Sequence, residues 1–310
     1  MIYLTRIKEQ VPAWGEGIRL ALYQGERPLG TRKAIESNLE KLEEVARKAS
    51  RFDVQLLALP ELYLSGYALD RQQVEELAEP VDGRSMARVA QIARDNRMAI
   101  ICPYAEREQA EGGERFYDSI ALIDSEAKTL LNYRKTHLFG QTERENFSDG
   151  AGPFAVAEIA GFPVGVLNCY EAEFPELSRI IAVKGAKLIV IPTAADYYYT
   201  LADGSQAQVP YPDVSRTLIP ARAYENKLFI AYANRCGGEK RGGHEWNYRH
   251  NSVIAGPDGK LLLAARAEET LLIGDCVPGD FPPTHPEGDY LKDRRPELYR
   301  ELISPQPQPF

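Results

Sequence analysis

The stretch VGVLNCYEAEFPEL, residues 164–177, runs from apolar residues into a cysteine and then into acidic residues. Its apolar half predicts a buried strand over residues 162–170, and Pro175 begins a predicted helix over residues 175–186. Cys169 therefore lies where a strand gives way to a loop. A buried cysteine is usually an inert small hydrophobic residue, whereas a cysteine at a strand end can be a nucleophile. The choice depends on whether the chain also supplies a base, a cation and oxyanion donors.

Strand and helix patterns alternate along all 310 residues. The apolar run at 54–61 predicts a strand that is buried on both faces. The apolar spacing over 31–50 predicts a helix, with Thr31 as its N-cap. Residues 115–139 predict two strands joined by a turn near residues 124–126. No long linker divides the chain, so the patterns favour one α/β domain with two packed sheets and outer helices.

The segment 195–213, ADYYYTLADGSQAQVPYPD, interrupts this alternation. It is rich in tyrosine, glycine and proline, which predicts a loop. A loop that carries so many aromatic rings is expected to line a pocket or an interface.

Charge and cysteine usage exclude several classes of protein. The net charge of -8 argues against a nucleic-acid binder and against docking on an anionic membrane. No apolar run approaches the ~20 residues that span a bilayer, and the N-terminus lacks the apolar stretch of a secretory signal. Widely spaced cysteines favour a reduced, cytoplasmic chain without disulfides or a zinc site. These cysteines are Cys102, Cys169, Cys236 and Cys276.

Three reactive side chains follow apolar strands: Glu61, Lys135 and Cys169. Taken singly, they are a turn residue, a solvated charge and a structural thiol. Together they can support nucleophilic catalysis by the cysteine. A carboxylate can take the proton of the thiol, whose ordinary pKa is about 8.5, and an ammonium lowers the thiol pKa and stabilises an oxyanion. The backbone N–H of Tyr170 is a candidate second oxyanion donor. No histidine adjoins the cysteine, although His137, close to Lys135, leaves a Cys–His pair open.

Three motifs carry a resemblance to a known family: LALPELYLSGY (57–67), YRKTHLFGQTERENFSDG (133–150) and GVLNCYEAEFPE (165–176). The chain resembles the nitrilase or carbon–nitrogen hydrolase superfamily, whose members carry a glutamate, a lysine and a cysteine motif in this order. Residues 222–237 and 250–259 resemble further blocks of that family. The resemblance divides the chain into an N-terminal extension, a carbon–nitrogen hydrolase domain and a C-terminal tail, at residues 1–17, 18–277 and 278–310.

The resemblance implies a role for each residue. Glu61 would be the general base, Lys135 the oxyanion-stabilising cation and Cys169 the nucleophile. Glu143 stands eight residues after the lysine, where the family places a second glutamate near the active site; otherwise it is an ordinary charge in a mixed run. The implied fold is a four-layer α-β-β-α sandwich that forms a homodimer or a larger homo-oligomer. No metal or organic cofactor is expected.

The resemblance also bears on the substrate. The closest similarity is to the amidase branch that contains 5-aminopentanamidases and stereoselective amidases, with N-carbamoylputrescine amidases nearby. We therefore expect hydrolysis of a primary amide, aliphatic and possibly amino-substituted, through a cysteine thioester. The alternatives are an N-carbamoyl amine amidohydrolase, a nitrilase and a catalytically silent scaffold. The candidate substrate-binding residues are Tyr67, Tyr170, Glu173 and Ala194.

The acidic residues after Cys169 favour a neutral or cationic substrate over a carboxylate. An alternative role for Glu173 and Glu176 is to stabilise the N-terminus of the helix that follows, because acids there favour the helix dipole.

Overall fold

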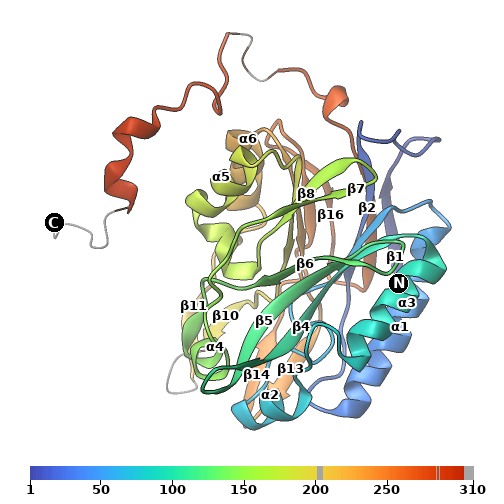
Figure 1. The fold of residues 1–310 in the computed structure, drawn as a ribbon, viewed down its shortest axis with the longest axis vertical. Coiled ribbons are helices and arrows are strands. Elements are labelled where there is room, and N and C mark those ends of the chain that lie inside the picture. The colour runs from blue at the N-terminus through green and yellow to red at the C-terminus, as the bar shows by residue number, and fades with distance from the viewer. Residues whose placement is uncertain (201–204, 284, 286, 304–310) are drawn as a thin grey trace.

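Two large β-sheets form the centre of the molecule, as the computed structural model shows for residues 1–200, 205–283, 285 and 287–303 (Figure 1). The first sheet has the strand order β1 (Ile2–Arg6), β17 (Thr270–Cys276), β2 (Ile18–Gln24), β3 (Leu56–Ala58), β4 (Ala99–Ala110), β5 (Gly113–Ile123) and β6 (Thr129–Arg134). The second has the order β16 (Leu261–Ala264), β15 (Val253–Ala255), β12 (Phe229–Ala233), β9 (Leu188–Pro192), β8 (Phe162–Val166) and β7 (Val156–Ile159). Of the strands that lead to the predicted site, β3 pairs in parallel with β2 and β4, and β8 pairs in parallel with β9.

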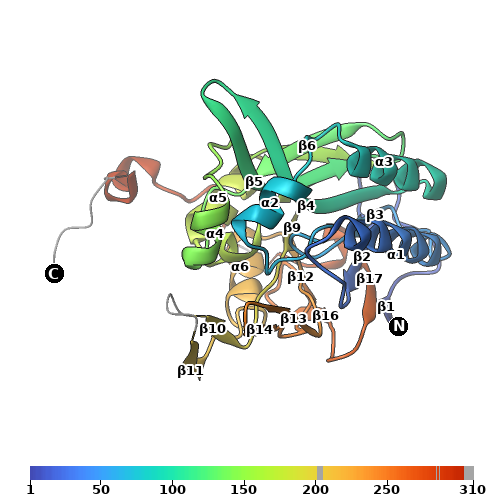
Figure 2. The same cartoon turned by 90° about the horizontal axis from the view of Figure 1, so that it is seen from below.

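Helices cover the outer face of each sheet. The helices are α1 (Arg32–Ser50), α2 (Arg71–Leu77), α3 (Arg84–Asn96), α4 (Gly140–Asn146), α5 (Pro175–Val183) and α6 (Leu218–Asn226). Helices α1 and α3 lie side by side on the first sheet, while α5 and α6 pack on the second (Figure 2). Thr31 caps α1 as predicted, because its Oγ1 accepts the N–H of Ala34 at 3.1 Å.

Three apolar layers hold this arrangement together. One lies between the two sheets and brings Leu20 and Leu56 of the first sheet against Val164 and Phe229 of the second. Another packs the first sheet against α1 and α3, and the third packs the second sheet against α5 and α6. Burial of apolar area at ~25 cal/mol per Å² makes such layers the main favourable term in folding. The predicted four-layer α-β-β-α sandwich is confirmed.

The prediction that residues 195–213 form only a loop is wrong. Part of this segment forms a two-stranded antiparallel ribbon of β10 (Tyr198–Thr200) and β11 (Gln206–Pro210), and residues 201–204 lie outside the described ones. A second ribbon pairs β13 (Gly238–Arg241) with β14 (His244–Asn247). Tyrosine and threonine suit strands, but the runs are too short for a period of two to be recognised.

Both predicted terminal segments contain regular secondary structure. The predicted N-terminal extension contributes β1, which pairs in parallel with β17, so it belongs to the first sheet. Two short 3₁₀ helices, η3 (Pro296–Leu298) and η4 (Arg300–Ile303), stand away from the sheets in both views (Figures 1 and 2). The last part of the predicted tail, residues 304–310, lies outside the described residues. No helix in the described part of the chain has the length and apolar character needed to cross a bilayer.

Candidate active site

A strained turn presents Cys169. Strand β8 ends at Val166, and Cys169 opens a 3₁₀ helix, η1 (Cys169–Glu173). The φ of Cys169 is +48°, in the left-handed region that non-glycine residues rarely adopt. Such strain of about 1–3 kcal/mol persists where the surroundings impose it, often at functional sites. The backbone N–H of Ala194 donates to the sulfur of Cys169.

A buried ion pair holds the turn that carries Glu61. The guanidinium of Arg235 donates to the carbonyl oxygen of Glu61 at 2.7 Å and to that of Leu62 at 2.8 Å. The same guanidinium binds Glu239 at 2.9 Å. The other carboxylate oxygen of Glu239 accepts the N–H of Tyr67 at 2.9 Å. This pair therefore fixes both ends of the segment from Glu61 to Tyr67, and sequence reasoning missed it.

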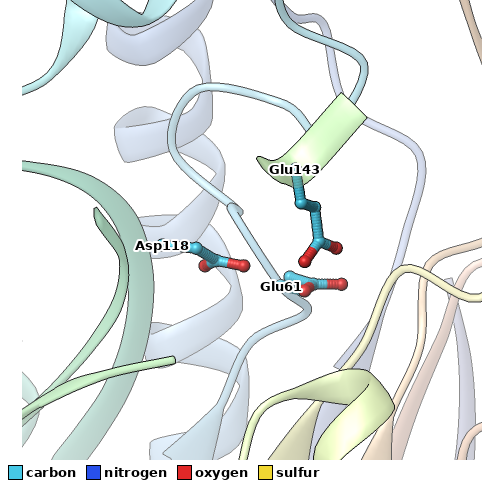
Figure 3. Close-up of side chains that lie close together, drawn as sticks. All are labelled: Glu61, Asp118 and Glu143. Atoms are coloured by element: carbon cyan, nitrogen blue, oxygen red, sulfur yellow. The ribbon is translucent and has the colours of Figure 1, made fainter. Parts of the chain in front are cut away.

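Lys135 contacts three carboxyl groups, and Figure 3 shows that these three, of Glu61, Asp118 and Glu143, lie close together. Its Nζ is 2.6 Å from Oε1 of Glu61, 2.8 Å from Oε2 of Glu143 and 3.6 Å from Oδ2 of Asp118. The four side chains come from β5, α4, the end of β6 and the loop after β3, and all are buried. One oxygen from each carboxyl lies within 4.8 Å of the others, and the cation they surround is the Lys135 ammonium. Asp118 is a member that the motifs did not indicate.

Tyr67 extends the cluster toward solvent. Its hydroxyl donates to Oε1 of Glu143 at 2.7 Å, and Oε2 of Glu143 accepts the N–H of Phe139 at 2.7 Å. Glu143 therefore connects the lysine to the segment that begins α4. The sequence prediction places Glu143 near the active-site residues, and in the structure Glu143 contacts one of them, Lys135.

Burial and charge set the protonation of this cluster. Burial alone would lower the pKa of Lys135, but Glu143, Glu61 and Asp118 outweigh it and hold that pKa well above its usual range. Burial is also the main reason why the pKa values of Asp118 and Glu143 are raised, and the Glu61 charge adds to it. The lysine is therefore a permanent cation at neutral pH.

The thiol pKa departs from the expectation that a nearby ammonium lowers it. The pKa of Cys169 is raised well above its ordinary value, first by burial and then by the charge of Glu61, and Lys135 opposes both. Cys169 is therefore a neutral thiol in the free protein. It needs a base at the moment of attack, and Glu61 is the carboxylate whose charge acts on it most strongly.

Glu171 joins the cysteine turn to the lysine strand. Its buried carboxylate accepts the N–H of Asn168 at 2.8 Å, the hydroxyl of Tyr133 at 2.7 Å, and both the N–H and the Oγ1 of Thr136 at 2.7 Å. Asn168 precedes Cys169, and Thr136 follows Lys135. Sequence reasoning took Glu171 only as one of the acidic residues that make the segment after Cys169 negative, because nothing local shows that these donors meet it.

Glu171→Gln should therefore destabilise the protein. The amide keeps the shape, but it loses one acceptor oxygen and leaves buried donors unsatisfied. Each lost hydrogen bond to a charged group costs about 1.5–3 kcal/mol, so we expect the free energy of unfolding in urea to fall by about 3 kcal/mol or more. The matched control is Glu16→Gln at an exposed site, where a change of less than about 0.5 kcal/mol is expected. Equal stability of the two variants would contradict this role of Glu171.

A cavity opens above the sulfur of Cys169. The four predicted substrate-binding residues, Tyr67, Tyr170, Glu173 and Ala194, all line it. Five further aromatic residues line it: Phe139, Tyr199, Tyr211, Tyr232 and Trp246. Two of these rings come from the segment 195–213, so the expectation that this segment lines a pocket is confirmed.

The cavity wall contains two acidic side chains, each only partly ionised at neutral pH. Glu173 and Asp196 line it, and no lysine or arginine does so in the described part of the chain. Burial raises the pKa of each to about 7, against the opposing charges of Arg222 and Arg249 respectively. Arg222 is engaged elsewhere, because its guanidinium donates to the Glu173 backbone carbonyl at 2.9 Å.

His137 contacts Thr136 and Phe174, whereas a Cys–His catalytic pair would need it beside Cys169. Its Nδ1 lies 2.7 Å from Oγ1 of Thr136, and its ring packs on Phe174 with 4.5 Å between centroids. It does not line the cavity that Cys169 opens into. The charges that act on the thiol of Cys169 include those of Glu61, Lys135 and Glu143.

Comparisons with known proteins agree with this geometry. The chain is 41% identical over 286 residues to a Pseudomonas protegens protein named "Hydrolase in pqqF 5'region", covering 92% of each chain. It is 35% identical over 243 residues to an (R)-stereoselective amidase of a Pseudomonas species, covering 78% of this chain and 80% of that protein. A solved amidase from Nesterenkonia sp. AN1 superposes with a TM-score of 0.72 at 31% identity, covering 96% of this chain and 100% of that one.

That solved structure shows covalent addition of the acetamide moiety of fluoroacetamide at its active-site cysteine. A family model described as carbon-nitrogen hydrolase matches residues 19–284, nearly the whole chain. The resemblance inferred from the three motifs is thereby confirmed: the chain belongs to the carbon-nitrogen hydrolase family.

Proposed function

We propose that the protein hydrolyses a primary amide to a carboxylic acid and ammonia through a thioester on Cys169. The observation that carries the proposal is that the thiol of Cys169 lines the cavity and lies under the charges of Glu61 and Lys135, which are buried and paired at 2.6 Å. The similarity to amidases supports it.

Acylation uses Glu61 as base and then as acid. Glu61 takes the Cys169 proton while the sulfur bonds to the amide carbon, and the carbonyl electrons move onto the oxygen. The Lys135 ammonium and the Tyr170 backbone N–H stabilise that oxyanion. The C–N bond then breaks, Glu61 returns the proton to the nitrogen, and ammonia leaves.

Deacylation repeats these steps with water. Glu61 removes a proton from the water, the water oxygen bonds to the thioester carbon, and the C–S bond breaks. The proton returns to the sulfur, so the enzyme is regenerated and the acid is released. Glu143 acts as a positioning residue that holds Lys135 and Tyr67.

We propose that the cavity prefers an amide whose acyl chain carries a protonated amine. Glu173 offers a half-buried carboxylate, aromatic rings attract cations, and no cation lines the described wall. Tyr67 and Tyr170 would contact the acyl chain, and Ala194 would lie beside the sulfur.

An ammonia-release screen tests the reaction and the preference together. The substrates are ω-amino amides, matching alkyl amides, N-carbamoyl amines and nitriles of graded length. We expect Glu173→Gln to lower kcat/KM for amino amides about tenfold, because one charge-assisted hydrogen bond is worth about 1.5 kcal/mol, and to leave alkyl amides unchanged. An equal effect on both amide series would contradict the role of Glu173.

The same screen separates the alternatives. Carbon dioxide released with ammonia would indicate an N-carbamoyl amine amidohydrolase, and consumption of nitriles alone would indicate a nitrilase. If none of these substrates is hydrolysed, the protein would be a catalytically silent scaffold.

We also propose a homo-oligomer in the cytoplasm. Helix α5 exposes Ile180 and Val183, and the C-terminal arm that stands away from the sheets exposes Leu298, Leu302 and Ile303. A second copy of the chain would cover such an apolar surface. A monomeric mass in solution at micromolar concentration would contradict the oligomer. Four unpaired cysteines support a reducing compartment.

A further inference from the structure

The cluster around Lys135 contains more carboxyl groups than its charge can balance. Glu61, Asp118 and Glu143 face a single ammonium, and all four side chains are buried. If every carboxyl were ionised, the cluster would carry two uncompensated negative charges away from water. Uncompensated buried charge is costly, and a buried carboxyl group takes up a proton instead.

The hydrogen bonds indicate which carboxyl carries that proton. Glu143 accepts from Lys135, Tyr67 and the backbone N–H of Phe139. Glu61 has the shortest contact to the ammonium, at 2.6 Å. Asp118 is the farthest of the three from Nζ, at 3.6 Å, so it is stabilised least as an anion.

Buried oxygen atoms without a hydrogen-bond partner also indicate that Asp118 carries the proton. Both oxygens of Asp118 and Oε2 of Glu61 are buried, and none has a hydrogen-bond partner among the described residues. The two carboxyl groups are within hydrogen-bonding reach of each other, and the Asp118 carboxyl points toward Glu61 in Figure 3. Two ionised carboxylates cannot donate, so this contact would be repulsive. One proton between them supplies a donor and satisfies both groups.

We propose that Asp118 is protonated at neutral pH and donates its O–H to Oε2 of Glu61. Lys135 donates to the other oxygen, Oε1, so Glu61 is held as a carboxylate between two donors. The inference rests on the proposed role of Glu61 as base. Asp118 is then a positioning residue: it orients the base, and its proton lowers the net charge of the cluster from −2 to −1.

The charge environment supports this assignment. The charged groups that face Asp118 are Glu61 from the loop after β3, Lys135 at the end of β6 and Glu143 from α4. Burial raises the pKa of Asp118 well above its ordinary value, the Glu61 charge adds to it, and Lys135 opposes both.

Two substitutions of similar size test the proposal. Asp118→Asn keeps a donor toward Glu61, so kcat should stay within about threefold of wild type. Asp118→Leu removes the donor and should lower kcat at least tenfold with KM unchanged, because the base loses its orientation. The proposal is overturned if the asparagine variant is as impaired as the leucine variant, since an ionised carboxylate would then be required. Wild-type kcat in the leucine variant would also overturn it.

Infrared spectroscopy gives a readout that does not depend on activity. At neutral pH the difference spectrum of wild type minus Asp118→Asn should show the C=O stretch of a protonated carboxyl group, because the bands of Glu173 and Asp196, whose pKa values are about 7, cancel in it. Glu143→Gln is the matched control and should keep the band. Absence of this band from the difference spectrum would refute the protonated state of Asp118. This test stands even if the leucine variant does not fold, or if no amide is hydrolysed and the proposed function fails.

Discussion

Cys169→Ala should abolish ammonia release, with kcat falling by at least about 10⁴-fold as for other lost nucleophiles. The methyl group cannot form the thioester, and the other groups of the site cannot replace the sulfur. The fold should be retained, because the residue is half-buried and the substitution removes a single atom. Steady-state assays and thermal melting measure the two effects.

Cys102→Ala is the matched control for this prediction. Cys102 lies in the core between the first sheet and its helices, and burial raises the pKa of its thiol. Its truncation should cost about 1 kcal/mol of stability through lost packing and leave kcat unchanged. Retained turnover in the Cys169 variant, or equal losses of kcat in both variants, would contradict the assignment of the nucleophile.

Lys135→Met should lower kcat at least about 10³-fold, because one preorganised oxyanion donor alone is worth 10²–10³. Stability should also fall by about 3–5 kcal/mol, since Glu61 and Glu143 lose the cation that balances them. Ammonia-release assays and urea titration measure the two effects. The control is Lys184→Met on the exposed end of α5, where both quantities should stay near those of wild type.

The stability loss in Lys135→Met should grow with pH. Without the cation, burial keeps the pKa values of Asp118 and Glu143 above those of the unfolded chain, so the folded state binds more protons. Stability then falls as pH rises from the unfolded pKa through the folded pKa. The difference from wild type should therefore be larger at about pH 8 than at about pH 5.5. A difference that does not vary with pH would show that the carboxylates are not buried around Lys135 as described.

The sequence predicted the residues that follow strands. Glu61, Lys135 and Cys169 each come directly after an apolar run, where an α/β fold presents its functional groups. The motifs then supplied Glu143 by its spacing from the lysine. These residues could be recognised from the local sequence pattern and from their side-chain chemistry alone.

The supporting residues could not be predicted in the same way. Asp118 stands inside β5, where a lone acid reads as a solvent-facing residue, and only the pairing of β5 with β6 sets it beside Lys135. Glu171 and Arg235 act on donors and carbonyls from segments far away in the chain. Such contacts depend on how the two sheets pack, which periodicity does not encode.

The edges of the sheets show a similar limit. Strand β1 pairs in parallel with β17, although almost the whole chain separates them. The segment 195–213 carries clear aromatic character, yet its ribbon is too short to show alternation. Both features arise from tertiary pairing and not from local propensity.

Rapid acid quenching followed by peptide mass mapping tests the central claim most directly. During turnover of an amide, the account predicts that the peptide containing Cys169 gains the acyl group of the substrate, and that this adduct decays as the acid product forms. Full-rate ammonia release with the acyl group on another residue, or with no covalent adduct at any quench time, would contradict it.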